Sequence, residues 1–132
     1  MNQEQAETTI AQAKVIERFS AAWAAKDLDA LLELVTDDCV FRASVGPEPG
    51  TTYFGRDEVR RGFAQLLATL IDDASPQTEA EVTLLSRDFA VTRWTTRLPV
   101  DGGPPVVVRA CDIIEFEGGL IKFKDAYRKV YG

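Results

Sequence analysis

The chain has 132 residues, of which 45% are hydrophobic and 27% charged, so a single globular domain spanning residues 1–132 is predicted. The net charge of −6, without a basic cluster, argues against nucleic acid or an anionic membrane surface as a partner. The sequence contains no histidine, which excludes a Ser-His-Asp or Cys-His site and disfavours zinc.

A first helix is predicted after residues 1–7, which are expected to fray. Thr8 or Thr9 offers an N-cap, because a threonine oxygen can accept a hydrogen bond from an amide of the first helical turn. Apolar residues then recur at helical spacing and predict one buried stripe that contains Ile16, Phe19 and Trp23.

Two further helices are predicted. Asp27 is the expected N-cap of the segment DLDALLELV, and Asp37 and Asp38 are expected to be turn residues at its end. CVFRASV alternates like a short strand, and GPEPGTTYFG is typical of a rigid loop. The third helix, RDEVRRGFAQLLATLI, begins with Asp57 and Glu58, whose charges favour the N-terminal end of a helix dipole.

The second half of the chain is strand-like. Its four segments are TEAEVTLLS, FAVTRWTTRL, PVVVRACDIIEFE and LIKFKDAYRKVY. DGG and EGG separate the last three and are typical of hairpin turns. Helices followed by a meander of strands predict an α+β fold, in which three N-terminal helices pack on one face of a curved, mostly antiparallel sheet.

The cysteines and the start of the chain predict a cytoplasmic location. Cys39 and Cys111 lie far apart and match no metal or redox spacing, so both are expected to be buried thiols in a reducing compartment. The opening MNQEQAETTIAQAK lacks the layout of a secretory signal. No apolar run approaches the roughly 20 residues that span a bilayer, so no membrane partner is expected.

Several strings resemble the nuclear transport factor 2-like superfamily, which includes SnoaL-like cyclases and ketosteroid isomerases. They are AAWAAKDLDALLELVTDDCVF, GRDEVRRGF, AVTRWT and DIIEFEGGLIKFKDAY, and they span nearly the whole chain. The resemblance implies a single SnoaL-like domain shaped as a cone, with a strongly bent sheet, a deep pocket and a homodimer through the outer sheet face. It does not imply one reaction, because the fold hosts isomerases, cyclases, epoxide hydrolases and non-enzymes.

Asp112 is the first candidate catalytic residue, because it interrupts an apolar strand. Its neighbours on the same strand face, Ala110, Ile114 and Phe116, are apolar, and such surroundings favour a neutral carboxyl group. The resemblance to ketosteroid isomerases likewise implies a protonated acid that donates to a developing oxyanion. An ion pair with an arginine, or a solvated position at the mouth of the cone, is the alternative.

Arg93 is the expected counter-ion in that alternative. Alternation places Val91, Arg93 and Thr95 on one strand face, and the resemblance to epoxide hydrolases places this face inside the cone. Such a pair would keep Asp112 ionised, as a base or a ligand anchor. Trp94 would then lie on the outer face, where a large aromatic residue favours a dimer contact.

Two known sites of the superfamily are incomplete in this sequence. The general base of the ketosteroid isomerases falls near Ala43 and their tyrosine near Phe19, so steroid isomerisation by the standard route is rejected. The limonene-type epoxide hydrolases use Arg-x-Asp in the middle strand and a second Asp on the last strand. This chain keeps Arg93 but has Thr95 in place of the first acid, and no acid lies in register near Lys129.

Asp125 is the second candidate catalytic residue, as a proton shuttle of the SnoaL-like kind. A regular last strand would place it on one face with Ile121, Phe123 and Tyr127, and Lys124 on the other. A single bulge would invert which set lines the pocket, so both arrangements remain open. A position at the rim, paired with arginine or lysine, is the alternative for Asp125.

The expected partner is a small apolar molecule with one or two polar atoms. Arg93 and Tyr127 are candidates to orient it. Ordinary core packing is the alternative for the aromatic residues that are expected to line the pocket, namely Phe19, Trp23, Phe41, Tyr53 and Phe63.

Two functions remain open at this point. One is a small-molecule enzyme, without a cofactor or metal, that shuttles a proton in an isomerisation, cyclisation or dehydration. The other is a non-catalytic ligand-binding or accessory protein that uses the same pocket. A purely structural dimer module is a third alternative.

Overall fold

Helices dominate the first half of the chain and strands the second. The computed structural model describes residues 2–47, 49–68, 79–85, 88–100 and 102–129. The helices are α1 (Gln3–Ala24), α2 (Leu28–Glu33) and α3 (Gly55–Ala68). The strands are β1 (Val35–Arg42), β2 (Thr52–Phe54), β3 (Glu79–Leu85), β4 (Phe89–Val100), β5 (Gly103–Glu117) and β6 (Leu120–Arg128).

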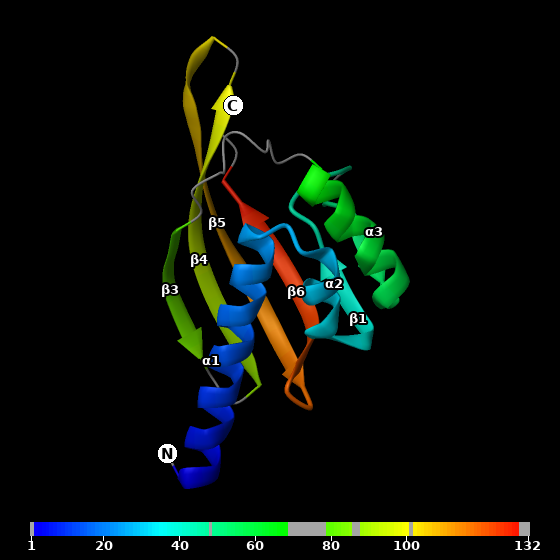
Figure 1. Ribbon diagram of the computed structural model, residues 1–132, viewed down its shortest axis with the longest axis vertical. Coiled ribbons are helices and arrows are strands. Elements are labelled where there is room, and N and C mark those ends of the chain that lie inside the picture. The colour runs from blue at the N-terminus through cyan, green and yellow to red at the C-terminus, as the bar shows by residue number, and fades with distance from the viewer. Residues whose placement is uncertain (1, 48, 69–78, 86–87, 101, 130–132) are drawn as a thin grey trace.

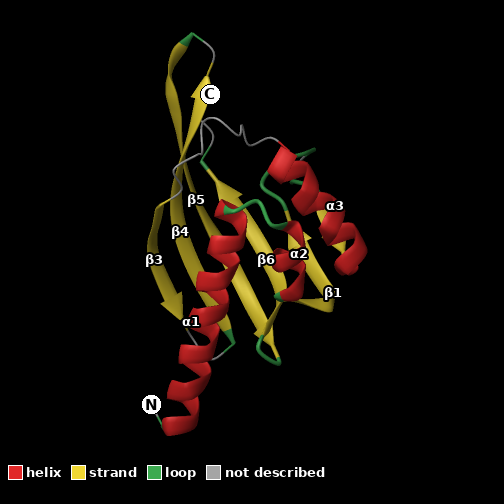
Figure 2. Cartoon of the chain, viewed as in Figure 1, coloured by secondary structure: helices red, strands yellow, loops and turns green. Residues whose placement is uncertain are grey.

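These six strands form one sheet in the order β2-β1-β6-β5-β4-β3. Neighbouring strands are antiparallel except for β1 and β6, which run parallel. The helices lie on one face of the sheet, with α1 passing over β5 and with α2 and α3 toward β6 and β1 (Figures 1 and 2). This is the predicted α+β fold, a cone-shaped roll whose helices cover the inner face of a curved, mostly antiparallel sheet.

One apolar core fills the space between the helices and the inner sheet face. Its members come from α1, α2, α3 and from β1, β4, β5 and β6, so every layer contributes to it. Burial of this shared surface is the main force that holds the helices on the sheet. The largest side chains that are almost inaccessible to solvent are Phe41, Phe63, Leu31, Ile114, Ile121, Val35 and Val59.

The first helix begins earlier than the sequence predicts. Asn2 Oδ1 accepts a hydrogen bond from the Gln5 amide (2.8 Å), and Gln5 Oε1 accepts one from the Asn2 amide (3.1 Å). This capping box satisfies two amides of the first turn. The prediction of an N-cap at Thr8 or Thr9 was therefore wrong, and residues 3–7, which were expected to fray, are helical.

The end of α1 turns sharply toward α2. The Asp27 amide donates to the Ala22 carbonyl (2.9 Å) and the Lys26 amide to the Trp23 carbonyl (3.1 Å). These two bonds define a Schellman motif, in which glycine is the usual residue at the left-handed position. Lys26 occupies this position with φ of 54°, which costs a lysine about 1 kcal/mol.

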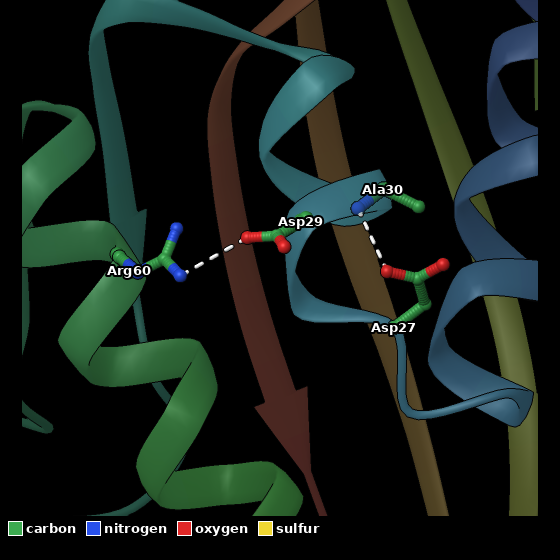
Figure 3. Close-up of polar contacts among 4 residues, drawn as sticks. All are labelled: Asp27, Asp29, Ala30 and Arg60. Carbon is green, nitrogen blue, oxygen red and sulfur yellow. Dashed lines mark hydrogen bonds and ion pairs between the residues drawn. The ribbon is translucent and has the colours of Figure 1, made fainter.

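Asp27 caps α2, as predicted from the sequence. Its Oδ1 accepts a hydrogen bond from the Ala30 amide at 3.1 Å (Figure 3). In the same view Arg60 of α3 pairs with Asp29 of α2 at 3.0 Å (Figure 3). Both side chains of this pair are largely exposed, so the pair orients α2 against α3 but contributes little to stability.

The first strand also begins earlier than predicted. Asp37 and Asp38 are exposed residues within β1, so their prediction as turn residues was wrong. Asp37 pairs with Arg56 at the start of α3, with 2.7 Å between Oδ1 and Nη1. The segment expected to be only a loop contains β2, whose Tyr53 lies opposite Phe41 of β1.

The glycine-rich hairpin turns are confirmed. Gly102 joins β4 to β5, and Gly118 and Gly119 join β5 to β6, with φ values of 74°, 59° and 81°. Only glycine adopts such angles without strain. The ends of the predicted segments RDEVRRGFAQLLATLI and TEAEVTLLS lie outside the described residues. No helix in the described ranges is long and apolar enough to cross a bilayer.

We expect Lys26→Gly to raise the free energy of unfolding by about 0.5–1 kcal/mol, because glycine adopts the left-handed conformation without steric cost. Urea denaturation followed by circular dichroism measures the change. Lys14→Gly, at an exposed position inside α1, is the matched control and should lower the free energy of unfolding by about 1 kcal/mol. An equal loss in both variants would contradict the assigned cap.

Candidate functional site

Asp112 lies on the inner face of the sheet, as the alternation of β5 predicts. Its side chain points toward the helices together with Ala110, Ile114 and Phe116, and all four residues are buried. Only 7% of Asp112 is exposed. A solvated position at the rim is therefore excluded for this carboxyl group.

Two side chains from the neighbouring strands hold the Asp112 carboxyl group. Lys124 of β6 places its Nζ 3.5 Å from Oδ1, and Trp94 of β4 donates its indole N–H to Oδ2 at 3.1 Å. The side chains of Lys124 and Asp112 are 9% and 11% exposed. The arrangement is a buried salt bridge with an added hydrogen bond to the carboxyl group, so the ion-pair alternative is observed with Lys124 in place of an arginine.

A bulge in β6 brings Lys124 inside. Ile121 and Lys124 are both buried although they are three residues apart, which a regular strand does not allow. The pairing with β5 explains this, because Phe116 lies opposite Ile121 but Glu115 lies opposite Phe123. The extra residue in β6 inverts the faces beyond it, as a bulge does. Of the two arrangements left open by the sequence, the one with Lys124 inside is therefore observed.

The Lys124 ammonium group lies against aromatic rings. Its Nζ is 4.7 Å from the centre of the Phe41 ring and 5.9 Å from that of Trp23. Such cation–π contacts stabilise a charge that has left water. A row of opposed residues on the inner face places Phe41 of β1 beside Lys124 of β6 and Ile114 of β5. Lys124 is thus bounded by aromatic side chains and by Asp112.

The five aromatic residues predicted to line a pocket form one cluster. Neighbouring rings within it have centroids 4.9–6.2 Å apart, mostly in tilted or edge-to-face geometry. Phe19, Phe41 and Phe63 are fully buried and belong to the core, whereas Trp23 and Tyr53 are half-buried beside it. The Tyr53 hydroxyl donates to Gln65 Oε1 of α3 at 3.0 Å. The cluster therefore packs the core and also bounds the ion pair.

Arg93 does not lie inside the cone, where the resemblance to the epoxide hydrolases implies it. Residues Thr92 and Trp94 of β4 face inward, and Arg93 is exposed on the opposite face, with its Cα opposite Cys111. The expected Arg93–Asp112 pair was wrong, and Lys124 is the cation of the pair. Trp94 is correspondingly not on the outer face, so its predicted dimer contact was also wrong.

Asp125 and Tyr127 share the outer face beyond the bulge. The Tyr127 hydroxyl donates to Asp125 Oδ2 at 2.9 Å, and Tyr127 is 53% exposed. This hydrogen bond to a carboxylate raises the pKa of Tyr127 above its usual value of about 10. Neither side chain faces Asp112, so the structure separates them from the inner site.

Lys124, Trp94 and Thr92 are the inner residues that sequence reasoning missed. Thr92 is buried, with its Cα opposite that of Asp112. The inward position of Trp94 and Thr92 was open to prediction, because the alternation of β4 allows either of its faces to point inward. Lys124 lay on one of the two faces that the sequence left open, and nothing in LIKFKDAYR marks the bulge that turns this face inward.

The cysteines do not extend this site. Cys39 is buried in the core, where desolvation raises the pKa of its thiol. Cys111 is only half-buried and lies on the outer face, so the expectation that both thiols are buried was half correct.

The ion pair can perform acid–base chemistry. A carboxylate accepts a proton, and an ammonium group donates one or stabilises a negative oxygen. Two charges in an apolar interior are costly, and an apolar pair of similar size often gives equal or higher stability. Buried ionisable pairs of this kind are therefore candidates for a functional site.

The fold is that of the nuclear transport factor 2-like proteins. The profile of the SnoaL-like domain family matches residues 16–123, so the chain belongs to the SnoaL-like domain family. No curated protein matches the chain.

Solved structures share the fold at low sequence identity. An NTF2-like protein of unknown function from Mesorhizobium loti is 23% identical, with 92% of this chain and 93% of that chain covered and a TM-score of 0.75. An NTF2-like protein from Anabaena variabilis is 16% identical over 100% and 96% of the two chains, with a TM-score of 0.78. A protein of ketosteroid isomerase-like fold from Catenulispora acidiphila, in complex with trimethylamine, is 19% identical over 86% and 83%, with a TM-score of 0.68.

Lys124→Met is expected to lower the free energy of unfolding by about 3 kcal/mol, because it leaves the Asp112 carboxylate buried without its counter-ion. The double variant Asp112→Asn/Lys124→Met should regain most of this loss, since an amide oxygen still accepts from Trp94. Urea denaturation of the four proteins of this double-mutant cycle gives the coupling energy. Lys129→Met, at an exposed position just after β6, is the control and should change stability by less than about 0.5 kcal/mol. Full stability of Lys124→Met would disprove the coupling.

Proposed function

We propose that this protein is a cofactor-free enzyme that moves a proton on a small, largely apolar molecule held between the helices and the inner face of the sheet. One observation carries the proposal: Asp112 and Lys124 form an ion pair with side chains 11% and 9% exposed, in surroundings that are otherwise aromatic and aliphatic. Desolvation strengthens the interaction of both charges with a bound molecule.

The two charged residues have complementary roles in this proposal. Asp112 is the base, and the Trp94 N–H fixes the orientation of its carboxylate. Lys124 stabilises the negative charge that develops on the substrate when the proton leaves. Isomerisation, cyclisation and dehydration can each begin with such a transfer. Arg93, Asp125 and Tyr127 have no part in it, because they lie on the outer face.

A non-catalytic binding protein is the second candidate. It is favoured by the fact that both oxygens of Asp112 already accept a hydrogen bond, from Lys124 and from Trp94. A carboxylate held by two hydrogen bonds suits a fixed polar anchor. The same aromatic cluster and ion pair would then hold an apolar molecule without turnover.

Proton transfer can be tested with 5-nitrobenzisoxazole, an apolar probe. When a base removes its carbon-bound proton, the N–O bond breaks and a coloured cyanophenolate forms. We expect the wild type to accelerate this reaction and Asp112→Asn to lower kcat/KM by about 100-fold or more, because the base is lost. Absorbance measures the product.

Asp38→Asn is the matched control, because it removes an exposed carboxylate of β1 and should leave the rate unchanged. An equal rate in Asp112→Asn and in the wild type would rule out Asp112 as the base. A wild type with no activity, together with retained binding of the probe, would favour the non-catalytic candidate.

We also propose that the protein forms a homodimer through the outer sheet face. In the part of the chain that the structure describes, no helix covers this face (Figure 1). Ile113 is 37% exposed at its centre, with Val91 of β4 opposite it. Arg93 and Asp125 provide both signs of charge around this apolar centre, so a second copy rotated by two-fold symmetry can match them.

Sedimentation velocity over a range of concentrations tests the homodimer. The wild type is expected to sediment as a dimer and Ile113→Lys as a monomer, because a charge in the centre of the interface remains without a partner. Ile10→Lys, at an exposed position of α1, is the control and should remain dimeric. A wild type that is monomeric at every concentration would refute the interface.

A further inference from the structure

The hydrogen-bonding capacity of the inner cluster restricts what can bind beside it. Trp94 has one N–H and directs it at Asp112. Lys124 has three N–H groups and directs one at Asp112, while its ammonium group lies over the rings of Phe41 and Trp23. A ligand that approaches Lys124 therefore meets hydrogen-bond donors, and its matching atom is an acceptor.

The charge of the cluster restricts the ligand further. Asp112 and Lys124 neutralise each other at 3.5 Å, so the cluster as a whole is neutral. A carboxylate beside Lys124 is attracted by Lys124 but repelled by Asp112, and an ammonium group beside Asp112 is attracted by Asp112 but repelled by Lys124. The neutral pair therefore offsets little of the cost of removing either charge from water. This cost is large here because the surroundings are apolar and the two side chains are buried. An uncharged ligand avoids it.

We infer that this cluster selects an uncharged, amphipathic ligand with an acceptor oxygen, such as that of a ketone or ester, and that Asp112 determines this specificity by excluding carboxylates. Asp112 stands where the carboxylate of an acidic ligand would otherwise lie against Lys124. The inference rests on the proposed function in one respect, since it requires that the ligand reaches Lys124. It does not require that any proton is transferred.

Three probes of equal chain length test this selectivity, namely 2-decanone, decanoate and decylammonium. Isothermal titration calorimetry is expected to show that the wild type binds 2-decanone at least about tenfold more tightly than either charged probe. In Asp112→Asn, Lys124 loses its counter-ion, so decanoate should bind at least about tenfold more tightly than it binds the wild type. The double variant Asp112→Asn/Lys124→Met should lose the gain for decanoate.

Two outcomes overturn the inference. One is a wild type that binds decanoate as tightly as 2-decanone, and the other is an Asp112→Asn variant that folds, as thermal melting shows, without gaining affinity for decanoate. If Asp112→Asn does not fold, the comparison of the probes on the wild type decides alone. Binding of none of the probes also overturns it.

The failure of this inference can be distinguished from failure of the proposed function. Turnover of 5-nitrobenzisoxazole without selectivity among the three probes would retain proton transfer and overturn the specificity. Selective binding of 2-decanone without turnover would retain the specificity and overturn catalysis.

Discussion

The inner site depends on one electrostatic constraint: two opposite charges lie in an apolar interior only because each neutralises the other. Asp112 of β5 and Lys124 of β6 meet this constraint from adjacent strands. The bulge in β6 makes the meeting possible, since without it Asp125 would face Asp112 and two carboxylates would share one apolar space. The bulge in β6 is therefore the feature that places a cation, and not a second carboxylate, beside Asp112.

The sequence predicted the architecture well because its patterns are long. Helical stripes and alternating strands extend over many residues, and the unbroken alternation from Ala110 to Phe116 placed Asp112 on the inner face correctly. Short-range features were predicted less well. Thr9, for example, donates its hydroxyl to the Gln5 carbonyl inside α1 (2.9 Å) instead of capping the helix, because Asn2 already does so.

The site was only partly predictable for the same physical reason. Which face of β4 or β6 is buried depends on pairing with strands distant in sequence, and a single inserted residue reverses it. Arg93 and Lys124 are both cations in strands that flank β5, and nothing local distinguishes the inward one. The aromatic residues posed a different question. Core packing and the lining of a pocket were alternative predictions for these residues. Phe41 is a fully buried core residue, and its ring also lies against the Lys124 ammonium group.

The parallel pairing of β1 with β6 has a consequence for how the chain reaches this structure. Phe41 lies opposite Lys124, so the innermost contacts join two segments separated by most of the polypeptide. Closing so large a loop costs configurational entropy before any contact repays it, and folds dominated by such distant pairings form slowly. Among the described strands, β6 comes latest in the sequence, and it lies between β1 and β5, so it completes the interior. A chain without β6 would leave one edge of β1, beneath the helices, without a partner strand.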